Sequence, residues 1–504
     1  MNVAYFLEDH IKRLEEVSSL IFEEKAYKNV WIRENSNRLA NGLKSLGVEK
    51  GDRVVVSLPN SPEVIVAFQA IFRIGGIIAP IMFLMTPEVT EFILSDCEAK
   101  VFITSQDASD KIQKAMEMSS ISHIIVLRGE EEGPRITPYE KLIQEQSGDF
   151  KIEEMDKDNV ALLIYTAGTT GRPKGVMLTH GNLYHHSTAT YNLWERDKPR
   201  RVLSCLPLAH MFGVTAMLID QLNEHPESVF VLMSWFDPEE IFRLIEKYKT
   251  TGMGGVPTMF WVLLADPSIE KYDLSSMERC VVGAAPLPDE LYKSFESKFN
   301  IEMIEAYGLS ESCSAVACTR PDQVRKPGSA GTRVGEAILK IFDDDDNELP
   351  PGEPGEIVVS GPIVMKGYYK RPEETEEALR GGWLHTGDIG YLDEDGYLYI
   401  TDRGKDMIIK GGENIFPSEV ENVLLKHPLV AESAVIGIPD EKYGEEVMAF
   451  VVKKPGEEIT EEEIISHCHN NYSKFKCPSR IKFVDNLPKS LVGKVLKKEL
   501  RTMI

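Results

Sequence analysis

A loop rich in glycine and hydroxyl groups lies between two short apolar segments of the chain. It reads Tyr165-Thr-Ala-Gly-Thr-Thr-Gly-Arg-Pro-Lys-Gly175 and directly follows the apolar segment Val160-Ala-Leu-Leu-Ile164. Glycine lets backbone N–H groups converge on an anion without clashes from a Cβ atom, threonine hydroxyls add donors, and Lys174 adds a compact positive charge. These residue types at this spacing predict a binding site for the phosphates of a polyphosphorylated ligand.

The same loop does not fit the P-loop of nucleoside triphosphatases, which requires Gly-x-x-x-x-Gly-Lys-Ser/Thr at the start of a helix. Pro173 precedes the lysine, and the chain continues as a second strand-like segment, Gly175-Val-Met-Leu-Thr179. The pattern therefore favours a hairpin-like flap over phosphates. An ordinary turn of glycine and threonine between two strands is the alternative.

Further motifs make the chain resemble the adenylate-forming enzymes, the superfamily of acyl-CoA synthetases, luciferases and peptide-synthetase adenylation domains. The resemblance extends over nearly the whole chain and keeps the family's order of motifs, but it does not name the acid. The motifs are Arg38-Leu-Ala-Asn41, Gly51-Asp-Arg-Val54, Leu58-Pro-Asn-Ser61, Leu206-Pro-Leu-Ala-His210, Val256-Pro-Thr258, Gly283-Ala-Ala-Pro-Leu287, Glu305-Ala-Tyr-Gly-Leu-Ser-Glu311, Trp383-Leu-His-Thr-Gly-Asp388, Asp402-Arg-Gly-Lys-Asp406, Lys410-Gly-Gly-Glu-Asn414 and Pro488-Lys-Ser-Leu-Val-Gly-Lys494.

Composition limits the classes of partner and compartment. A chain of 504 residues with 42% hydrophobic residues is long enough for two or more domains. A net charge of −24 argues against nucleic acid or an anionic membrane surface as a partner, because both require a basic surface. Seven cysteines, an odd number without a Cys-x-x-Cys pair or a secretory leader, indicate reduced thiols and a cytoplasmic location.

Two local patterns could indicate a membrane span and a metal site, but the surrounding residues argue against both. Residues 64–85 are apolar and long enough to span a bilayer, but Arg73, Gly75-Gly76 and Pro80 divide them into a helix, a turn and a buried strand, so no integral membrane segment is expected. His467-Cys468-His469 with Cys477 suggests a metal site, yet the spacing matches no zinc template.

The order of apolar segments predicts an α/β fold. Strand-like segments alternate with amphipathic helical ones from about residue 50 to 310, as in layered parallel sheets, and Asp237-Pro238 marks a helix start. Short strands with Gly/Pro turns follow, and the aspartates of residues 343–346 fit a solvated hairpin tip better than a cation site. We expect a large N-terminal adenylation domain (residues 1–402) that binds ATP and the acyl group, with layered α/β sheets. The resemblance adds a distorted β-barrel to it, a hinge at residues 403–406 around Lys405, and a small mobile α+β lid domain (residues 407–504).

The resemblance assigns nucleotide contacts residue by residue. It places the departing phosphates at the threonine-glycine loop, Mg²⁺ at Glu311 with the Thr170 hydroxyl, adenine at Tyr307 opposite Gly283-Ala-Ala285, and ribose at Asp388 with Arg403 close by. The expected ATP site consists of Thr166, Ala167, Gly168, Thr169, Thr170, Lys174, Gly283, Ala284, Ala285, Glu305, Ala306, Tyr307, Gly308, Ser310, Asp388, Arg403 and Lys494. The family usually has threonine at the position of Ser310, and the hydroxyl is kept here.

Two lysine segments near the end of the chain receive roles that only the resemblance supplies. Lys494 would bridge the attacking carboxylate and the α-phosphate, and would leave when the small domain rotates. The rotation would bring Lys410, Gly411, Gly412 and Glu413 to the active site, where they would admit the pantetheine arm of CoA. A thiol ionises at a pKa of about 8.5, so this step does not require a dedicated base.

The acid is expected next to His210, which we interpret as a gate because a carboxylate ionised at pH 7 needs no base. The expected acyl pocket is formed by His210, Met211, Phe212, Val256, Gly283, Ser312 and Cys313. Because these segments contain no lysine or arginine, an uncharged aliphatic or aromatic tail is favoured over a dicarboxylate.

Together these expectations describe an ATP-dependent acyl-CoA synthetase that uses Mg²⁺ and acts on a fatty or aryl acid, with Lys494, Thr170, Glu311 and His210 as its catalytic residues. Three alternatives stay open: an acyl-AMP ligase that loads a carrier protein, a luciferase-like oxidation of the adenylate, and a nucleotide-binding regulator without catalysis. The sequence does not determine the oligomeric state, and a homodimer is compatible with it.

Overall fold

The structure is a computed structural model that describes residues 1–166, 172–194, 198–285, 287–403, 406–411, 413–454, 456, 458–490 and 493–504, and gives no side-chain description at 402, 403 and 414. Its helices in these ranges are α1 (Tyr5–Leu14), α2 (Asn29–Ser45), α3 (Pro62–Arg73), α4 (Pro87–Asp96), α5 (Ser109–Glu117), α6 (Tyr139–Gln144), α7 (His180–Tyr191), α8 (Met211–Asp220), α9 (Pro238–Tyr248), α10 (Pro257–Ala265), α11 (Asp289–Phe299), α12 (Pro372–Ala378), α13 (Pro417–Leu425), α14 (Glu461–Asn471) and α15 (Lys497–Leu500).

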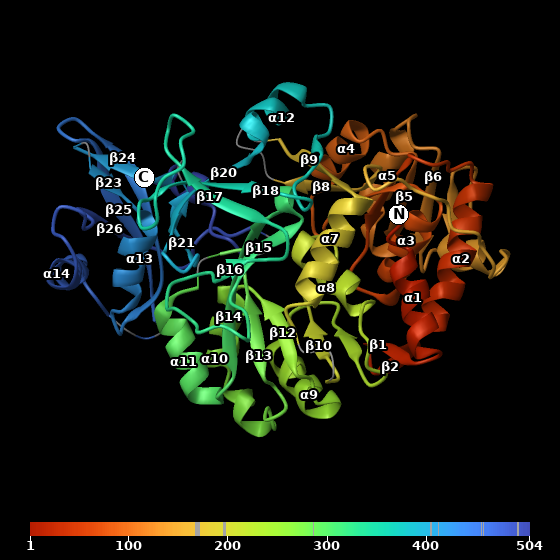
Figure 1. The fold of residues 1–504 in the computed structure, drawn as a ribbon, viewed down its shortest axis with the longest axis horizontal. Coiled ribbons are helices and arrows are strands. Elements are labelled where there is room, and N and C mark those ends of the chain that lie inside the picture. The colour runs from red at the N-terminus through yellow and green to blue at the C-terminus, as the bar shows by residue number, and fades with distance from the viewer. Residues whose placement is uncertain are drawn as a thin grey trace.

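A largely parallel sheet forms the N-terminal third of the molecule (Figure 1). Its inner strands are parallel, whereas β8 and β9 form an antiparallel hairpin and β19 pairs with β9. In spatial order the strands are β19 (Gly367–Tyr368), β9 (Lys174–Thr179), β8 (Val160–Thr166), β4 (Ile77–Pro80), β3 (Arg53–Ser57), β5 (Val101–Ser105), β6 (His123–Leu127) and β7 (Ile136–Pro138).

A second large sheet carries most of the predicted site motifs at its strand ends. From β1 through β14 its neighbouring strands are parallel, apart from the β1–β2 hairpin. In spatial order they are β16 (Thr332–Arg333), β15 (Ser314–Cys318), β14 (Glu302–Leu309), β13 (Arg279–Val282), β12 (Gly252–Gly255), β10 (Arg201–Ser204), β11 (Val229–Leu232), β1 (Ser18–Phe22) and β2 (Lys25–Lys28).

Three hydrophobic clusters show how these sheets are layered. The largest lies between the sheets and contains Phe68 of α3, Leu183 of α7 and Met217 of α8. A second cluster packs α9, α10 and α11 on the outer face of the second sheet, and a third packs α4 and α5 on the outer face of the first. The predicted α/β layering is therefore confirmed, and helices α7 and α8 lie against the face of the second sheet that is turned inward.

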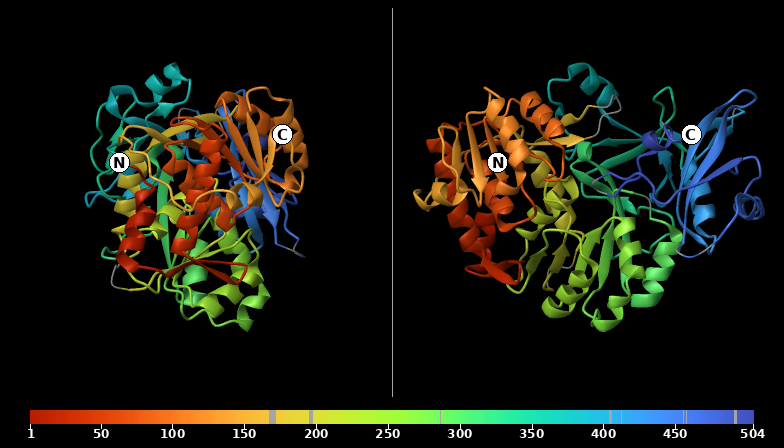
Figure 2. Two further views of the ribbon diagram at one scale, coloured as in Figure 1. Left: turned by 90° about the vertical axis from the view of Figure 1, so that its right-hand side faces the viewer. Right: turned by 180° about the vertical axis from the view of Figure 1, so that it is seen from behind.

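The remaining strands form two smaller sheets toward the C-terminus. An antiparallel sheet of β17 (Ile338–Phe342), β18 (Gly355–Ser360), β20 (Leu384–Leu392) and β21 (Leu398–Arg403) corresponds to the expected barrel region. The last sheet contains β22 (Ile408–Lys410), β23 (Glu413–Ile415), β24 (Val430–Asp440), β25 (Gly444–Lys453) and β26 (Arg480–Phe483), and it has its own core with α13 and α14. Figure 1 and the right-hand view of Figure 2 both show this sheet at the end of the molecule away from the first sheet.

Several local predictions are confirmed. Residues 64–80 form α3, a turn and β4, and the Asp237 carboxylate accepts from the N–H of Glu240 at 2.8 Å, which caps α9 behind Pro238. The aspartates after β17 form a turn in which Asp343 accepts from the backbone of Asp345 and Asn347. Among the described helices, none has the length and apolar character needed to cross a bilayer.

Candidate functional site

One continuous cavity of about 2560 Å³ connects most of the predicted site residues. Its walls come from the β8–β9 hairpin, the C-terminal ends of β13 and β14, helices α7 and α8, strand β20 and the C-terminal segment around Lys494. Residues that are hundreds of positions apart in the chain therefore face one space. Two regions are distinct: a polar end near Lys174, Glu311 and Asp388, and a channel between α8 and the second sheet.

The phosphate loop connects two antiparallel strands, as the hairpin-like flap requires. Thr166 pairs with Lys174 and Tyr165 with Gly175, and the Tyr165 hydroxyl donates to Asp96 at 2.8 Å, which anchors the hairpin. The expected phosphate ligands Ala167, Gly168, Thr169 and Thr170 lie outside the described residues, so their roles stay predictions.

Lys174 and Glu311 are connected through one tyrosine. The Lys174 ammonium pairs with the Glu374 carboxylate and lies 5.3 Å from the centre of the Tyr368 ring, whose hydroxyl donates to Glu311 Oε1 at 2.9 Å. Burial, followed by the negative charge of Glu311, raises the pKa of Tyr368 well above its usual range, so the hydroxyl stays protonated as a donor. Sequence reasoning missed Tyr368 and Glu374, because only the pairing of β19 with β9 brings them to this site.

Tyr307 and Asp388 meet at the predicted nucleoside position. The Tyr307 hydroxyl donates to Asp388 Oδ2 at 2.8 Å, and Asp388 is only 4% exposed. Arg403 is the backbone partner of Asp388 in the β20–β21 ladder. The predicted neighbours Asp388 and Arg403 are thus brought together.

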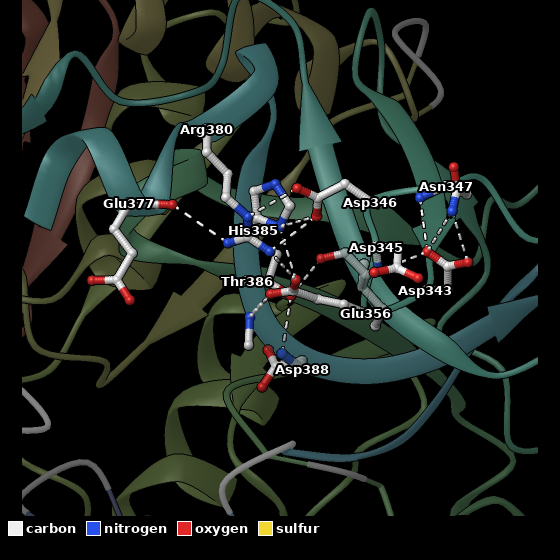
Figure 3. A network of polar contacts seen from close by, with 12 residues as sticks. Asp343, Asp345, Asp346, Asn347, Glu356, Glu377, Arg380, His385, Thr386 and Asp388 are labelled. Atoms are coloured by element: carbon white, nitrogen blue, oxygen red, sulfur yellow. Dashed lines mark hydrogen bonds and ion pairs between the residues drawn. The ribbon is translucent and has the colours of Figure 1, made fainter.

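A network of polar contacts fixes the turn that carries Asp388 (Figure 3). The Asp388 N–H donates to Thr386 Oγ1 at 3.1 Å, and Glu356 accepts from the Gly387 N–H at 2.9 Å and contacts His385 Nδ1 at 2.8 Å. Arg380 pairs with both Asp346 and Glu356. Side chains from strands β18 and β20, from the turn after β17 and from the segment of Arg380 therefore hold the backbone around Asp388 in place.

Glu305 and the segment Gly283–Ala285 form the wall next to Tyr307, together with Ala306, Gly308 and Ser310. Glu305 is buried and accepts from the Leu287 N–H at 3.3 Å, and burial raises the pKa of its carboxyl group to about 7. Ala284 adopts the left-handed backbone conformation with φ +67°. The segment therefore makes a tight turn with a weakly acidic carboxyl group directly behind it.

Lys494 lies at the same end of the cavity as His210. Gly493 directly before it packs on the N-terminal part of the chain, because a Cβ added to Gly493 would lie 2.7 Å from Thr258 Oγ1 and 3.4 Å from Val256 Cγ2. Burial lowers the pKa of His210, and the positive charge of Lys494 lowers it further. The Phe212 N–H donates to His210 Nδ1 at 3.3 Å, so His210 caps α8 as a neutral imidazole.

The channel begins at His210 and follows one face of α8. Its lining from this helix is Met211, Phe212, Thr215, Ala216, Ile219 and Asp220, which recur at helical spacing. From the sheet it takes alternate residues at β10 (Val202 and Ser204) and around β13 (Val281 and Gly283), and the consecutive residues Gly252, Met253 and Gly254 of β12. Gly254 keeps this wall free of a side chain, and a Cβ there would approach Leu206 and Phe212 at 3.2 Å.

The structure places the predicted acyl pocket residues differently. His210, Met211, Phe212 and Gly283 line the channel, whereas Val256 touches position 493, and Ser312 and Cys313 are buried with Cys313 in the central core. Ser314 and Ala315 line the cavity instead. Arg200 and Arg279 also line it, and sequence reasoning missed them because it looked for cations only in the motif segments. The alternation of Arg200, Val202 and Ser204 was the available signal.

The residues predicted to admit CoA lie in the C-terminal sheet. Lys410 is buried, pairs with Glu446 Oε1 at 2.5 Å and donates to the Phe475 carbonyl at 2.8 Å, and Gly411 has φ +59°. Glu413 begins β23, while Gly412 and the hinge residue Lys405 lie outside the described residues. The CoA and hinge assignments therefore stay predictions.

Comparison with known proteins agrees with this geometry. The family model of the AMP-binding enzymes matches residues 8–369, and that of the AMP-binding enzyme C-terminal domain matches residues 419–494. A long-chain-fatty-acid–CoA ligase of Bacillus subtilis is 35% identical over 98% of this chain and 93% of its own. A feruloyl-CoA synthase of Amycolatopsis is 36% identical over 92% and 91%. The crystal structure of ATP-bound MatB from Rhodopseudomonas palustris superposes with a TM-score of 0.91 at 30% identity, covering 100% of this chain and 99% of that one.

Proposed function

Because the chain belongs to the family of AMP-binding enzymes, we propose that it is an ATP-dependent acyl-CoA synthetase. A carboxylic acid attacks the α-phosphate of ATP, pyrophosphate leaves, and the thiol of CoA then displaces AMP from the acyl-adenylate. The observation that carries this proposal is the position of Lys494, which shares one end of the cavity with His210, Tyr307 and Asp388.

The residues at this end carry charges that suit the first step, in which two anions approach each other. The carboxylate and the α-phosphate are both anions, so their approach requires cations and dipoles already in place. Lys494 supplies one positive charge from the C-terminal side, and Lys174 supplies another at the end of the phosphate hairpin. The neutral His210 borders the carboxylate without adding a competing negative charge.

The chemistry of Glu311 also fits a Mg²⁺ ion that arrives with ATP. Its carboxylate is a hard oxygen ligand, oriented by the Tyr368 hydroxyl and facing the cavity. Within the described ranges, no group of three or more His, Cys, Asp or Glu side chains is arranged to hold a metal. Mg²⁺ often uses one or two carboxylates and substrate phosphates, where it neutralises phosphate charge.

For the second step we propose that the C-terminal domain rotates about the segment of residues 403–406. The rotation removes Lys494 and presents the segment from Lys410 to Glu413 to CoA. The separate core of this domain supports the idea, since the domain can move without exposing the main cores. All seven cysteines are buried free thiols, which supports a reducing compartment such as the cytoplasm.

The apolar walls of the channel support a fatty or aryl acid as the substrate. Acid-dependent ATP/pyrophosphate exchange by the purified protein tests the first step, and CoA-dependent AMP release tests the second. We expect both activities with a panel of fatty and aryl acids. If no acid supports exchange in the presence of Mg²⁺ and ATP, the proposed function is wrong.

A further inference from the structure

The acyl channel ends in a polar recess formed by Arg200, Asp220 and Asn223, all of which line the cavity. The length of helix α8 gives the distance from His210 to this recess, because His210 caps the first turn of the helix and Asp220 is its last residue. Ten helical residues span about 15 Å, so the recess faces the far end of a substrate whose carboxylate lies beside His210. The recess is outside the nucleotide end of the cavity.

Hydrogen-bonding capacity in the recess is only partly used. The guanidinium of Arg200 lies against the rings of Tyr191 and Trp194 at 5.6 and 5.9 Å, and its Nη1 has no hydrogen-bond partner among the described residues. Asn223 donates to Asp220 Oδ1 at 2.8 Å, while its own Oδ1 is buried and unpartnered within the described part of the chain. A buried donor and a buried acceptor without partners indicate a ligand group that supplies both.

The charges of the recess are balanced without a ligand. Burial raises the pKa of Asp220 to about 7, and the nearby positive charge of Arg200 opposes this shift, so the two side chains interact. Arg279, the other arginine of this wall, has Glu302 as its counter-ion at 3.6 Å. A second carboxylate on the substrate would therefore compete with Asp220 for the positive charge of Arg200, whereas a neutral hydroxyl can accept from Arg200 and donate to Asp220.

We propose that this recess recognises a hydroxyl group at the distal end of the acid. Arg200 donates a hydrogen bond to the hydroxyl oxygen, and Asp220 or Asn223 accepts a hydrogen bond from the hydroxyl group. The proposal rests on the acyl-CoA synthetase function and refines its substrate class. An extended dodecanoic chain is long enough to span the distance from His210, whereas a hydroxycinnamic acid is too short, so the hydroxyl belongs to an ω-hydroxy fatty acid.

Matched acids test the proposal on the full-length enzyme. The kcat/KM for CoA-dependent AMP release is compared for dodecanoic, ω-hydroxydodecanoic and dodecanedioic acids, and for cinnamic and para-hydroxycinnamic acids. We expect ω-hydroxydodecanoic acid to exceed dodecanoic acid by about tenfold or more, as for a hydrogen bond to a charged partner, and the diacid to be poor. The cinnamic pair is too short to reach the recess and should show no such preference.

Variants of the recess identify the residues responsible. Arg200→Leu should reduce kcat/KM for the hydroxylated acid to that of the parent acid measured on the same variant, mainly through KM. Asp220→Asn should raise the use of dodecanedioic acid relative to the hydroxy acid, because the charge of Arg200 is then uncompensated. Arg201→Leu is the matched control, since Arg201 does not line the cavity and instead bonds the Tyr248 carbonyl at 3.1 Å. Thermal melting reports whether each variant folds.

The outcomes separate this inference from the function on which it rests. If no acid is activated, the synthetase function is wrong. If dodecanoic acid is used as well as ω-hydroxydodecanoic acid, or the diacid is the best substrate, only the hydroxyl recess is wrong. Should Arg200→Leu fail to fold, the wild-type ratios and Asp220→Asn still decide the question.

Discussion

Lys494 is the residue whose loss should separate the two half-reactions. Lys494→Ala should lower acid-dependent ATP/pyrophosphate exchange by at least about a hundredfold, because one preorganised cation is removed from the approach of two anions. The same variant should convert a supplied acyl-adenylate and CoA to acyl-CoA at nearly the wild-type rate, since Lys494 has left the site by then. Rapid-quench assays of each half-reaction measure this.

Lys474→Ala provides the control, because Lys474 is an exposed lysine of the same domain that does not line the cavity. It should leave both half-reactions unchanged. An equal loss of both steps in Lys494→Ala would contradict the role given to this lysine, and with it the idea that it leaves between the steps.

Glu305 should make the folded protein sensitive to pH. Its pKa is raised by burial from 4.5 to about 7, so folding takes up a proton between these values and the free energy of unfolding falls as pH rises through this window. The penalty is on the order of 3 kcal/mol above pH 7 and absent below the unfolded pKa. Glu305→Gln removes this penalty. In thermal melting from pH 4.5 to 8, the melting temperature of the variant should therefore rise relative to that of the wild type as pH rises. A difference that does not change with pH would argue against a buried acidic proton.

At the scale of elements, the close approach of β14 and β15 requires the glycine between Tyr307 and the Glu311 turn. A Cβ on Gly308 would overlap the backbone carbonyl of Ser314 and come within 2.8 Å of the Ala315 Cα, and backbone atoms of a paired strand cannot move aside cheaply. Gly308→Ala should therefore destabilise the fold by on the order of 3 kcal/mol and raise the KM for ATP. Thermal melting and exchange kinetics measure both effects.

Gly133→Ala is the matched control, because a Cβ there meets nothing within 4 Å. It should melt like the wild type. If Gly308→Ala had the same melting temperature as Gly133→Ala, strands β14 and β15 could not approach each other as closely as they do in the structure.

The same scale shows what the sequence can predict. The cap at Asp237, the division of residues 64–80 and the hairpin of β8 and β9 depend on neighbours in the chain, so local patterns predict them. Tyr368 reaches Glu311 only because β19 pairs with β9, almost two hundred residues earlier, and this long-range pairing leaves no local signal. Arg200 had a local signal, because it alternates with Val202 and Ser204 of β10. This alternation indicates a cavity residue only once it is known which face of the sheet α8 covers. The motifs predicted which residues lie at the end of the cavity near Lys174, Glu311 and Asp388. The residues at the far end of the channel could be identified only from the three-dimensional fold.

At the scale of the whole molecule, the C-terminal domain is docked with Lys494 in the cavity, the arrangement that the proposed first half-reaction requires. Gly493 packs on Val256 and Thr258, and Ser418 of the small domain donates to the Thr401 carbonyl of the large one. This arrangement keeps Lys494 in the cavity and leaves the Lys410 segment in its own domain. The proposed rotation must break the contact between Gly493 and Thr258, so a bond placed there should stop the enzyme between its two steps.

A disulfide between cysteines at positions 258 and 493 tests this. The ideal Cβ of residue 493 lies 4.0 Å from the Thr258 Cβ, within the range of natural disulfides, and the left-handed backbone there costs a cysteine on the order of 1 kcal/mol. The seven native cysteines are buried, so oxidation should select the new pair. Oxidised Thr258→Cys/Gly493→Cys should keep acid-dependent pyrophosphate exchange and lose acyl-CoA formation, and reduction should restore it. The single variants control for the substitutions, thiol titration confirms the bond, and full CoA turnover by the oxidised protein would show that no rotation is needed.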